Sequence, residues 1–264
     1  MNAGAMIRAE LFVSKKTRIG LLVVLFYLVF GMLYLFAGSG AWVSAGDESQ
    51  FLGFSADEAY LMSLSIAQME DYWPVVVSFA HTVLFPVVAV FVSGMIFGIG
   101  GSESAESVSL ARGSTPRNAF CAKTVIGVMY AIAGYLVFTL LVVFTCAIWR
   151  GASLTTSFGV IFTRRLIANL LVNVSYMVMC SAVYSVIDSK SAASGGLLVV
   201  TFVGLVVSMS YPDAVAPFHM AYWMRTCGGS GPDPLISAVV YSIVSSGIAL
   251  FAREAACAWR TATR

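Results

Sequence analysis

Long runs of apolar residues, each bounded by charged ones, are the feature of this sequence that most restricts its fold. The first run, Ile19 to Ala37, follows Arg18 and contains no charged residue. A helix needs about 20 mainly apolar residues, at 1.5 Å each, to cross the roughly 30 Å hydrocarbon layer of a membrane. We therefore expect a single all-α, polytopic membrane domain over residues 1–264. Its six transmembrane helices should lie at about residues 19–37, 73–99, 124–149, 166–187, 194–212 and 235–252.

The composition agrees with a lipid environment. Hydrophobic residues make up 59% of the chain and charged residues 11%, against roughly 25% charged residues in soluble domains. The net charge of +2 is small, and the basic residues are too scattered to favour nucleic acid as a partner. The run Ile19–Ala37 is longer than the roughly 7–15 apolar residues of a cleavable signal peptide, so we interpret it as a retained transmembrane helix.

The distribution of basic residues predicts that both termini face the cytoplasm. Cytoplasmic segments of membrane proteins carry an excess of Lys and Arg. In an N-in and C-in orientation, 11 of the 15 basic residues lie inside. The remaining four lie outside: Arg150, Arg164, Arg165 and Arg225. We expect a multi-pass protein of a cell membrane, in particular the cytoplasmic membrane of a bacterium.

Two outer connections carry signals of local structure. Ser55 to Glu58 forms a capping-box pattern before an apolar stretch, which predicts a helix of about 12–15 residues on the outer surface. Ala214 to Met224 is apolar and aromatic but too short to cross the membrane. We expect this second segment to be re-entrant or to lie at the membrane interface.

The cytoplasmic connection between the second and third spans has the pattern of a short, well-terminated helix. Ser102 can cap its start, and Glu103 and Glu106 fall in its first turn. Arg112 falls in its last turn, so the charges complement the helix dipole. A rigid helix in this position could pass motion from a soluble partner to both spans. A simple surface turn explains the pattern equally well.

The third span has its own start signal. Thr115 and Pro116 have the residue types of an N-cap and a first helical position. We expect the helix to begin here, with Arg117 and Lys123 facing the cytoplasm.

Two segments and the six-span plan resemble a known family. The segments are Glu10 to Arg18 (ELFVSKKTR) and Gly113 to Lys123 (GSTPRNAFCAK). Together they resemble the permease subunits of type 2 ABC exporters, in particular the small permeases of lantibiotic immunity and bacitracin export.

The resemblance covers nearly the whole chain. It implies that residues 1–18 form an interfacial helix on the inner leaflet and that Glu103 to Arg112 form the coupling helix that docks on an ABC ATPase subunit. Either Glu103 or Glu106 corresponds to the acidic residue that precedes such a helix.

The sequence lacks the motifs of an enzyme. It contains no G-x-x-x-x-G-K-[ST] phosphate-binding loop, so ATP and Mg would be bound by the partner subunit and not by this chain. It also contains no H-E-x-x-H, no G-x-S-x-G and no C-x-x-C pair. We therefore expect a transporter subunit without catalytic, cofactor-binding or metal-binding residues.

A few polar residues interrupt the spans. His81 is the one titratable candidate inside the bundle, where it could act in transport or make an interhelical hydrogen bond near the outer surface. Asn169 and Asn173 are four residues apart on one helix face, a spacing that suits hydrogen bonds across a helix pair. Gly127, Gly134 and the pair Gly195–Gly196 should permit close helix packing.

These observations favour an exporter powered by a separate ATPase. Two permeases, identical or homologous, would assemble with two ATPases and move an amphipathic peptide, a drug or a lipid-like molecule. Two alternatives stay open: a membrane sensor or assembly module that transports nothing, and a secondary carrier that uses His81. The scarcity of charged residues inside the spans weighs against the carrier.

Overall fold

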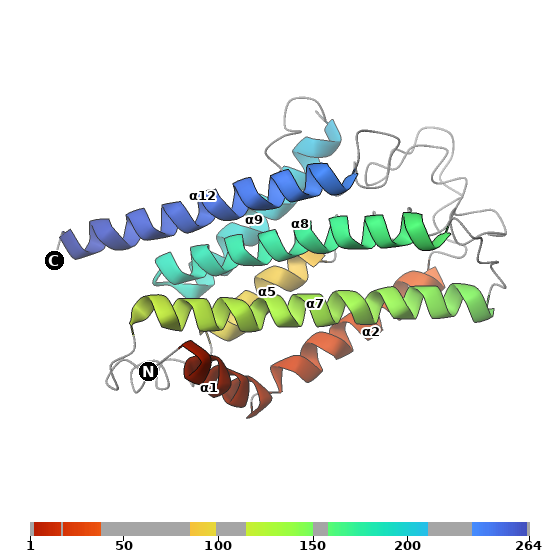
Figure 1. Cartoon of the computed structure of the whole chain (residues 1–264), viewed down its shortest axis with the longest axis horizontal. Helices are drawn as coiled ribbons and strands as arrows, with labels where there is room; N and C mark the ends of the chain where they lie inside the picture. The colour runs from red at the N-terminus through yellow and green to blue at the C-terminus, as the bar shows by residue number, and fades with distance from the viewer. Residues whose placement is uncertain are drawn as a thin grey trace.

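The computed structural model describes residues 3–16, 18–37, 85–98, 115–149, 158–210 and 234–262. All regular secondary structure in these ranges is helical, so the expected all-α fold is confirmed for the described part of the chain (Figure 1). The helices are α1 Ala3–Lys16, α2 Ile19–Ala37, α5 Phe85–Gly98, α7 Pro116–Trp149, α8 Phe158–Val186, α9 Lys190–Ser210 and α12 Pro234–Ala262.

Three of these helices are long and apolar enough to cross a membrane. The spans are Pro116–Leu141 in α7, Leu166–Val186 in α8 and Ala238–Trp259 in α12. Shorter apolar helical stretches occur at Ile19–Val29, Phe85–Gly98 and Lys190–Val203. The chain is a helical membrane protein, whereas the total of six crossings and their orientation stay predictions.

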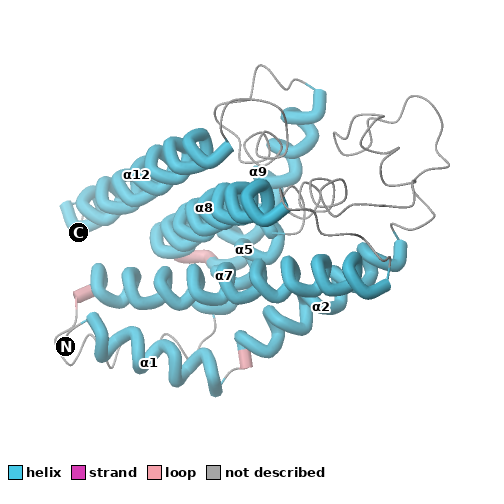
Figure 2. Tube along the Cα trace, turned by 45° about the vertical axis from the view of Figure 1, so that its right-hand side comes forward, coloured by secondary structure: helices cyan, strands magenta, loops and turns pink. Residues whose placement is uncertain are grey.

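The helices form one bundle around α8, which contacts α5, α7, α9 and α12. In Figure 1, α7 runs antiparallel to α8, whereas α12 runs in the same direction as α8. Both ends of the chain lie at the same end of the bundle (Figure 1). The turned view in Figure 2 shows α1 alongside the first part of α7, in agreement with the contacts between these two helices.

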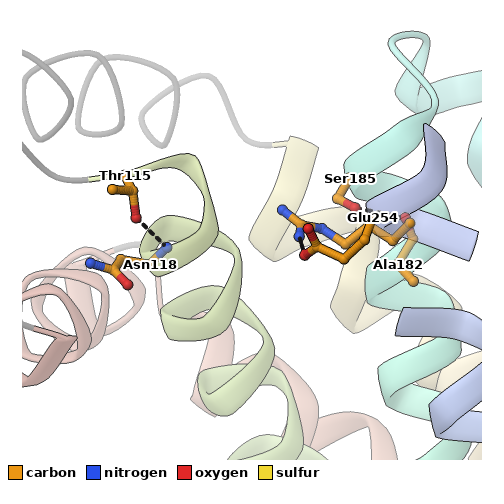
Figure 3. Close-up of polar contacts among 6 residues, drawn as sticks. Thr115, Asn118, Ala182, Ser185 and Glu254 are labelled. Carbon is orange, nitrogen blue, oxygen red and sulfur yellow. Dashed lines mark hydrogen bonds and ion pairs between the residues drawn. The ribbon is translucent and has the colours of Figure 1, made fainter. Parts of the chain in front are cut away.

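The helix bounds agree with the expected spans at some positions and extend past them at others. The first span coincides with α2. The third helix begins at Pro116, where the backbone N–H of Asn118 donates a hydrogen bond to Thr115 Oγ1 at 3.3 Å (Figure 3). The expected N-cap is thus confirmed. The helices α8 and α12 continue beyond the expected spans because a charged residue marks the depth of the membrane and does not end the backbone hydrogen-bonding pattern.

Several expected features lie outside the described residues. These are the outer helix near 55–69, the re-entrant or interfacial segment 214–224, the first part of the second span and the coupling helix 103–112.

Aromatic rings fill the centre of the bundle and join α2, α5 and α7. Phe85 lies 5.3 Å from Tyr27, 5.3 Å from Tyr135 and 5.6 Å from Phe138, measured between ring centroids. All four side chains are buried. Offset and edge-on ring pairs at these separations stabilise a core beyond the effect of buried area alone. The ring of Tyr27 occupies the space beside Gly134, which confirms the expected close packing at this glycine.

Candidate functional site

Cationic and aromatic side chains meet at the end of the bundle that holds both chain ends. We call this group the cation–aromatic junction and define it by Phe97 of α5, Phe120 and Lys123 of α7, Tyr184 of α8 and Arg253 of α12. The residues come from four helices that are far apart in the sequence. The junction therefore links the last turn of α5 and the first turns of α7 to the end of α12.

Two buried cations in the junction rest on aromatic faces. Lys123 is 3% exposed, and its Nζ lies 5.6 Å from the ring centroid of Phe97. Arg253 is 6% exposed, and its Cζ lies 4.0 Å from the ring centroid of Phe120. A cation within about 6 Å of a ring face is attracted by the negative face of the ring, and the attraction grows as water is excluded. These contacts compensate part of the cost of removing two positive charges from water.

The two aromatic rings also contact each other. The centroids of Phe97 and Phe120 are 6.3 Å apart, with the ring planes tilted by 46°. Phe97 is the second-to-last residue of α5, and Phe120 lies in the first turns of α7. The undescribed segment 99–114 joins these two helices, so both of its attachment points lie against the same cluster.

Tyr184 connects the junction to α9. Its ring stacks on Phe97 at 6.4 Å, with an angle of 15° between the planes. Its hydroxyl lies 2.5 Å from Ser194 Oγ and donates to the backbone carbonyl of Val90 at 3.2 Å. Lys190 Nζ donates to the backbone carbonyl of Tyr184 at 2.8 Å, at the turn between α8 and α9. Tyr184 thus contacts α5 and the start of α9 at the same time.

Arg253 has an acidic neighbour but incomplete hydrogen bonding. Its Nη1 donates to Glu254 Oε1 at 2.5 Å (Figure 3). Its buried Nε–H has no hydrogen-bond acceptor among the described residues. Adjacent residues on a helix point in different directions, so this ion pair requires Glu254 to bend back toward Arg253. The pair does not involve the buried Nε–H.

The structure describes some of the expected site residues and not others. Arg117 lies exposed in the first turn of α7, and its cytoplasmic location stays a prediction. Lys123 was expected to face the cytoplasm as well, but this expectation is wrong, because the side chain is buried on Phe97. Glu103, Glu106, Arg112 and His81 lie outside the described residues.

The sequence reasoning missed Arg253 as a site residue. A single cation after an apolar run is an ordinary membrane-boundary pattern, and the contact with Phe120 is non-local, so no local signal identifies it.

Asn169 and Asn173 are both buried within the bundle. The hydrogen bonds expected across a helix pair are not found for Asn169 Oδ1 or Asn173 Nδ2 within the described parts of the chain. Their helix face does bond to a neighbour, but through Tyr176, whose hydroxyl contacts Thr201 Oγ1 on α9. A bond across the helix pair by the other amide atoms of Asn169 and Asn173 stays a prediction.

The junction joins helix ends through aromatic rings and two buried cations. Across the described ranges, no group of three or more His, Cys, Asp or Glu side chains could hold a metal ion. A comparison of the sequence with protein-family models and with curated proteins found no match.

Proposed function

We propose that this chain is the membrane-spanning subunit of an ATP-driven exporter, with ATP hydrolysed by a separate ABC ATPase subunit. The substrate class would be an amphipathic peptide, a drug or a lipid-like molecule. A second copy of the chain, or a homologous permease, would complete the pathway across the membrane. The proposal builds on the resemblance of segments 10–18 and 113–123 to type 2 permeases and on the absence of a phosphate-binding loop from the sequence.

The contact between Phe97 and Phe120 is the observation that carries the proposal. It brings the two ends of the expected coupling segment together on buried cations from α7 and α12. A force applied to the segment by a soluble partner would act on α5 and α7 together. Because Arg253 packs on Phe120 and Tyr184 stacks on Phe97, α12 and α8 would move with them. Packed helix ends of this kind shift between discrete arrangements and do not deform continuously.

Co-purification tests the proposal directly. The tagged chain is solubilised from its native membranes in a mild detergent, and bound proteins are identified and counted by mass spectrometry. We expect a P-loop ATPase in a stoichiometric amount, and ATP-dependent export of substrate by the reconstituted complex. Arg112→Glu and Glu106→Lys should abolish export and release the ATPase, because they reverse the charges of the expected docking helix.

Matched variants separate a docking defect from misfolding. Arg112→Lys keeps the charge and should retain the ATPase, and all variants should reach the membrane fraction in equal amounts. Normal export by both charge-reversal variants would contradict the proposal. A proton-dependent flux that His81→Ala removes would favour a secondary carrier, and the absence of both flux and ATPase would favour a sensor or assembly module.

A further inference from the structure

A groove between α8 and α12 forms a cavity of about 410 Å³. This volume falls in the range of roughly 300–1,000 Å³ that is typical of sites for small molecules. Its lining includes Met179 and Val183 of α8 and Val244, Ile248 and Arg253 of α12. The α12 part runs along about three turns of one helix face and ends at Arg253. The groove is apolar along its length and cationic at one end.

Small side chains and internally satisfied polar groups explain this character. Ala182, Ala249 and Ala252 line the groove, so the two helices leave space between them. Ser245 also lines it, but its hydroxyl donates to the backbone carbonyl of Tyr241 at 2.7 Å. The serine therefore offers no free donor to a ligand. The unsatisfied donor on this lining belongs to Arg253.

Arg253 has the properties of a side chain that binds an anion. Its side chain is more than nine-tenths buried, and its Nε–H has no acceptor within the described part of the chain. A buried, unsatisfied donor on a charged group is costly. Glu254 pairs with Nη1, but its own side chain is 54% exposed, so water screens that carboxylate. An anion at the end of the groove would satisfy the donor that Glu254 leaves free.

The surroundings of the groove indicate which anion can reach it. Ile243, Ile248 and Phe251 are exposed large apolar residues of α12, which is the expected surface for contact with acyl chains. Trp259 is exposed further along the same helix, and Trp is enriched where a membrane meets water. Arg253 lies between these two regions, one residue beyond the expected end of the span at residue 252. With the span ending there, the groove would open to lipid along its length and end near the phosphates.

We propose that the groove binds an anionic phospholipid of the surrounding bilayer. One acyl chain lies between α8 and α12, and the headgroup phosphate accepts hydrogen bonds from Arg253. An Arg guanidinium is well suited to this role because its planar donors match phosphate oxygens. Since Arg253 packs on Phe120, an occupied site also stabilises the cation–aromatic junction from the lipid side. The proposal requires a membrane location but does not depend on export activity.

Photocrosslinking in lipid nanodiscs tests where the lipid binds. The full chain is reconstituted in phosphatidylcholine with a small fraction of phosphatidylglycerol that carries a photoreactive acyl chain. We expect crosslinks on Met179–Val183 and Val244–Ile248, mapped by mass spectrometry. The same label on phosphatidylcholine should give about tenfold fewer crosslinks there, because both lipids have the phosphate but the choline cation cancels the net negative charge that attracts Arg253. Equal labelling by both lipids would overturn the proposal.

Variants with opposite expected effects sharpen the test. Arg253→Gln should reduce crosslinking by phosphatidylglycerol to the phosphatidylcholine level, whereas Glu254→Gln should increase it because the competing carboxylate is removed. Arg117→Gln makes the same change at an exposed cation of α7 and should have no effect.

Filling the groove provides a test that does not alter Arg253. Ala249→Leu should block the groove and abolish the crosslinks, whereas Ala255→Leu places the same side chain at an exposed position of α12 and should not. Crosslinks that persist in Ala249→Leu would overturn the proposal. Lipid crosslinks found only at positions outside the groove would do the same.

Discussion

Close contact between glycines and large side chains sets the spacing of several helices in this bundle. A Cβ added at Gly134 would meet the ring of Tyr27, and one at Gly127 would meet the end of Met177. Both partner side chains are buried and cannot move into open space. By contrast, no atom of the described residues lies within 4 Å of a Cβ built at Gly195 or Gly196. The expectation of close packing is thus confirmed at the first two positions and wrong at the pair on α9.

Gly134→Ala should lower the stability of the bundle. Tyr27 packs on Phe85 and is 1% exposed, so the added methyl group forces the aromatic core apart. Overpacking of this kind costs about 1–3 kcal/mol, which a thermal unfolding scan in detergent would detect as a lower midpoint. Gly195→Ala is the matched control, because it has space and gains helix propensity of up to about 1 kcal/mol. Equal midpoints for the two variants would contradict the packing argument.

The burial of Lys123 and Arg253 could not be predicted from the sequence. Charge pattern alone indicates that a lysine near the start of a span faces the aqueous side. The structure buries Lys123 because Phe97, from a different helix, offers a ring face. Local sequence contains no record of that partner. Whether a cation in a membrane protein is buried can therefore be inferred only once its tertiary structure is known.

At the scale of helices, the sequence predicted which helices exist and where they lie better than it predicted how long they are. Apolar composition identified every described helix from α2 onward, and the Thr115–Pro116 signal placed the start of α7 correctly. The start of α8 was placed too late, after Arg165, and the end of α12 too early, before Arg253, because charged residues were used as boundaries. A helix continues through the interface as long as its backbone hydrogen bonds can form, so hydropathy determines only the part within lipid.

Loss of the Thr115 cap should weaken the start of α7 without affecting its membrane-spanning part. Thr115→Ala removes the acceptor for the Asn118 amide, and such a loss costs about 1 kcal/mol. We expect faster hydrogen exchange at Asn118 and unchanged exchange beyond the junction at Lys123. Thr115→Ser keeps the hydroxyl and should exchange at the original rate. An unchanged rate in Thr115→Ala would show that the capping bond does not limit opening of this turn.

At the scale of the whole molecule, the distribution of side chains is that of a protein surrounded by lipid. Buried positions include polar groups such as Ser93, Thr139 and Asn169, whereas many large apolar side chains are exposed. Those on α12 include Ile243, Ile248 and Phe251. In water, a contiguous apolar surface of this kind would drive aggregation. In a bilayer it faces acyl chains, and the polar groups are kept inside the bundle.

The final prediction concerns the sidedness of this bundle. Cys121 is exposed near the start of α7, and Cys257 lies one turn beyond Arg253 on α12. Because Arg253 packs on Phe120, both cysteines lie at the same end of the bundle, whichever way the protein is inserted.

Single-cysteine variants, in which Cys121 or Cys257 is the only one of the five cysteines that is kept, should therefore show the same sidedness toward a membrane-impermeant maleimide. The excess of basic residues at this end further predicts that neither reacts in intact cells and that both react after permeabilisation. Ser49→Cys in the expected outer segment, introduced into a cysteine-free chain, should react in intact cells. Labelling of only one of the two cysteines in intact cells would contradict the packing of α12 against α7, whereas labelling of both would leave the fold intact and reverse the orientation.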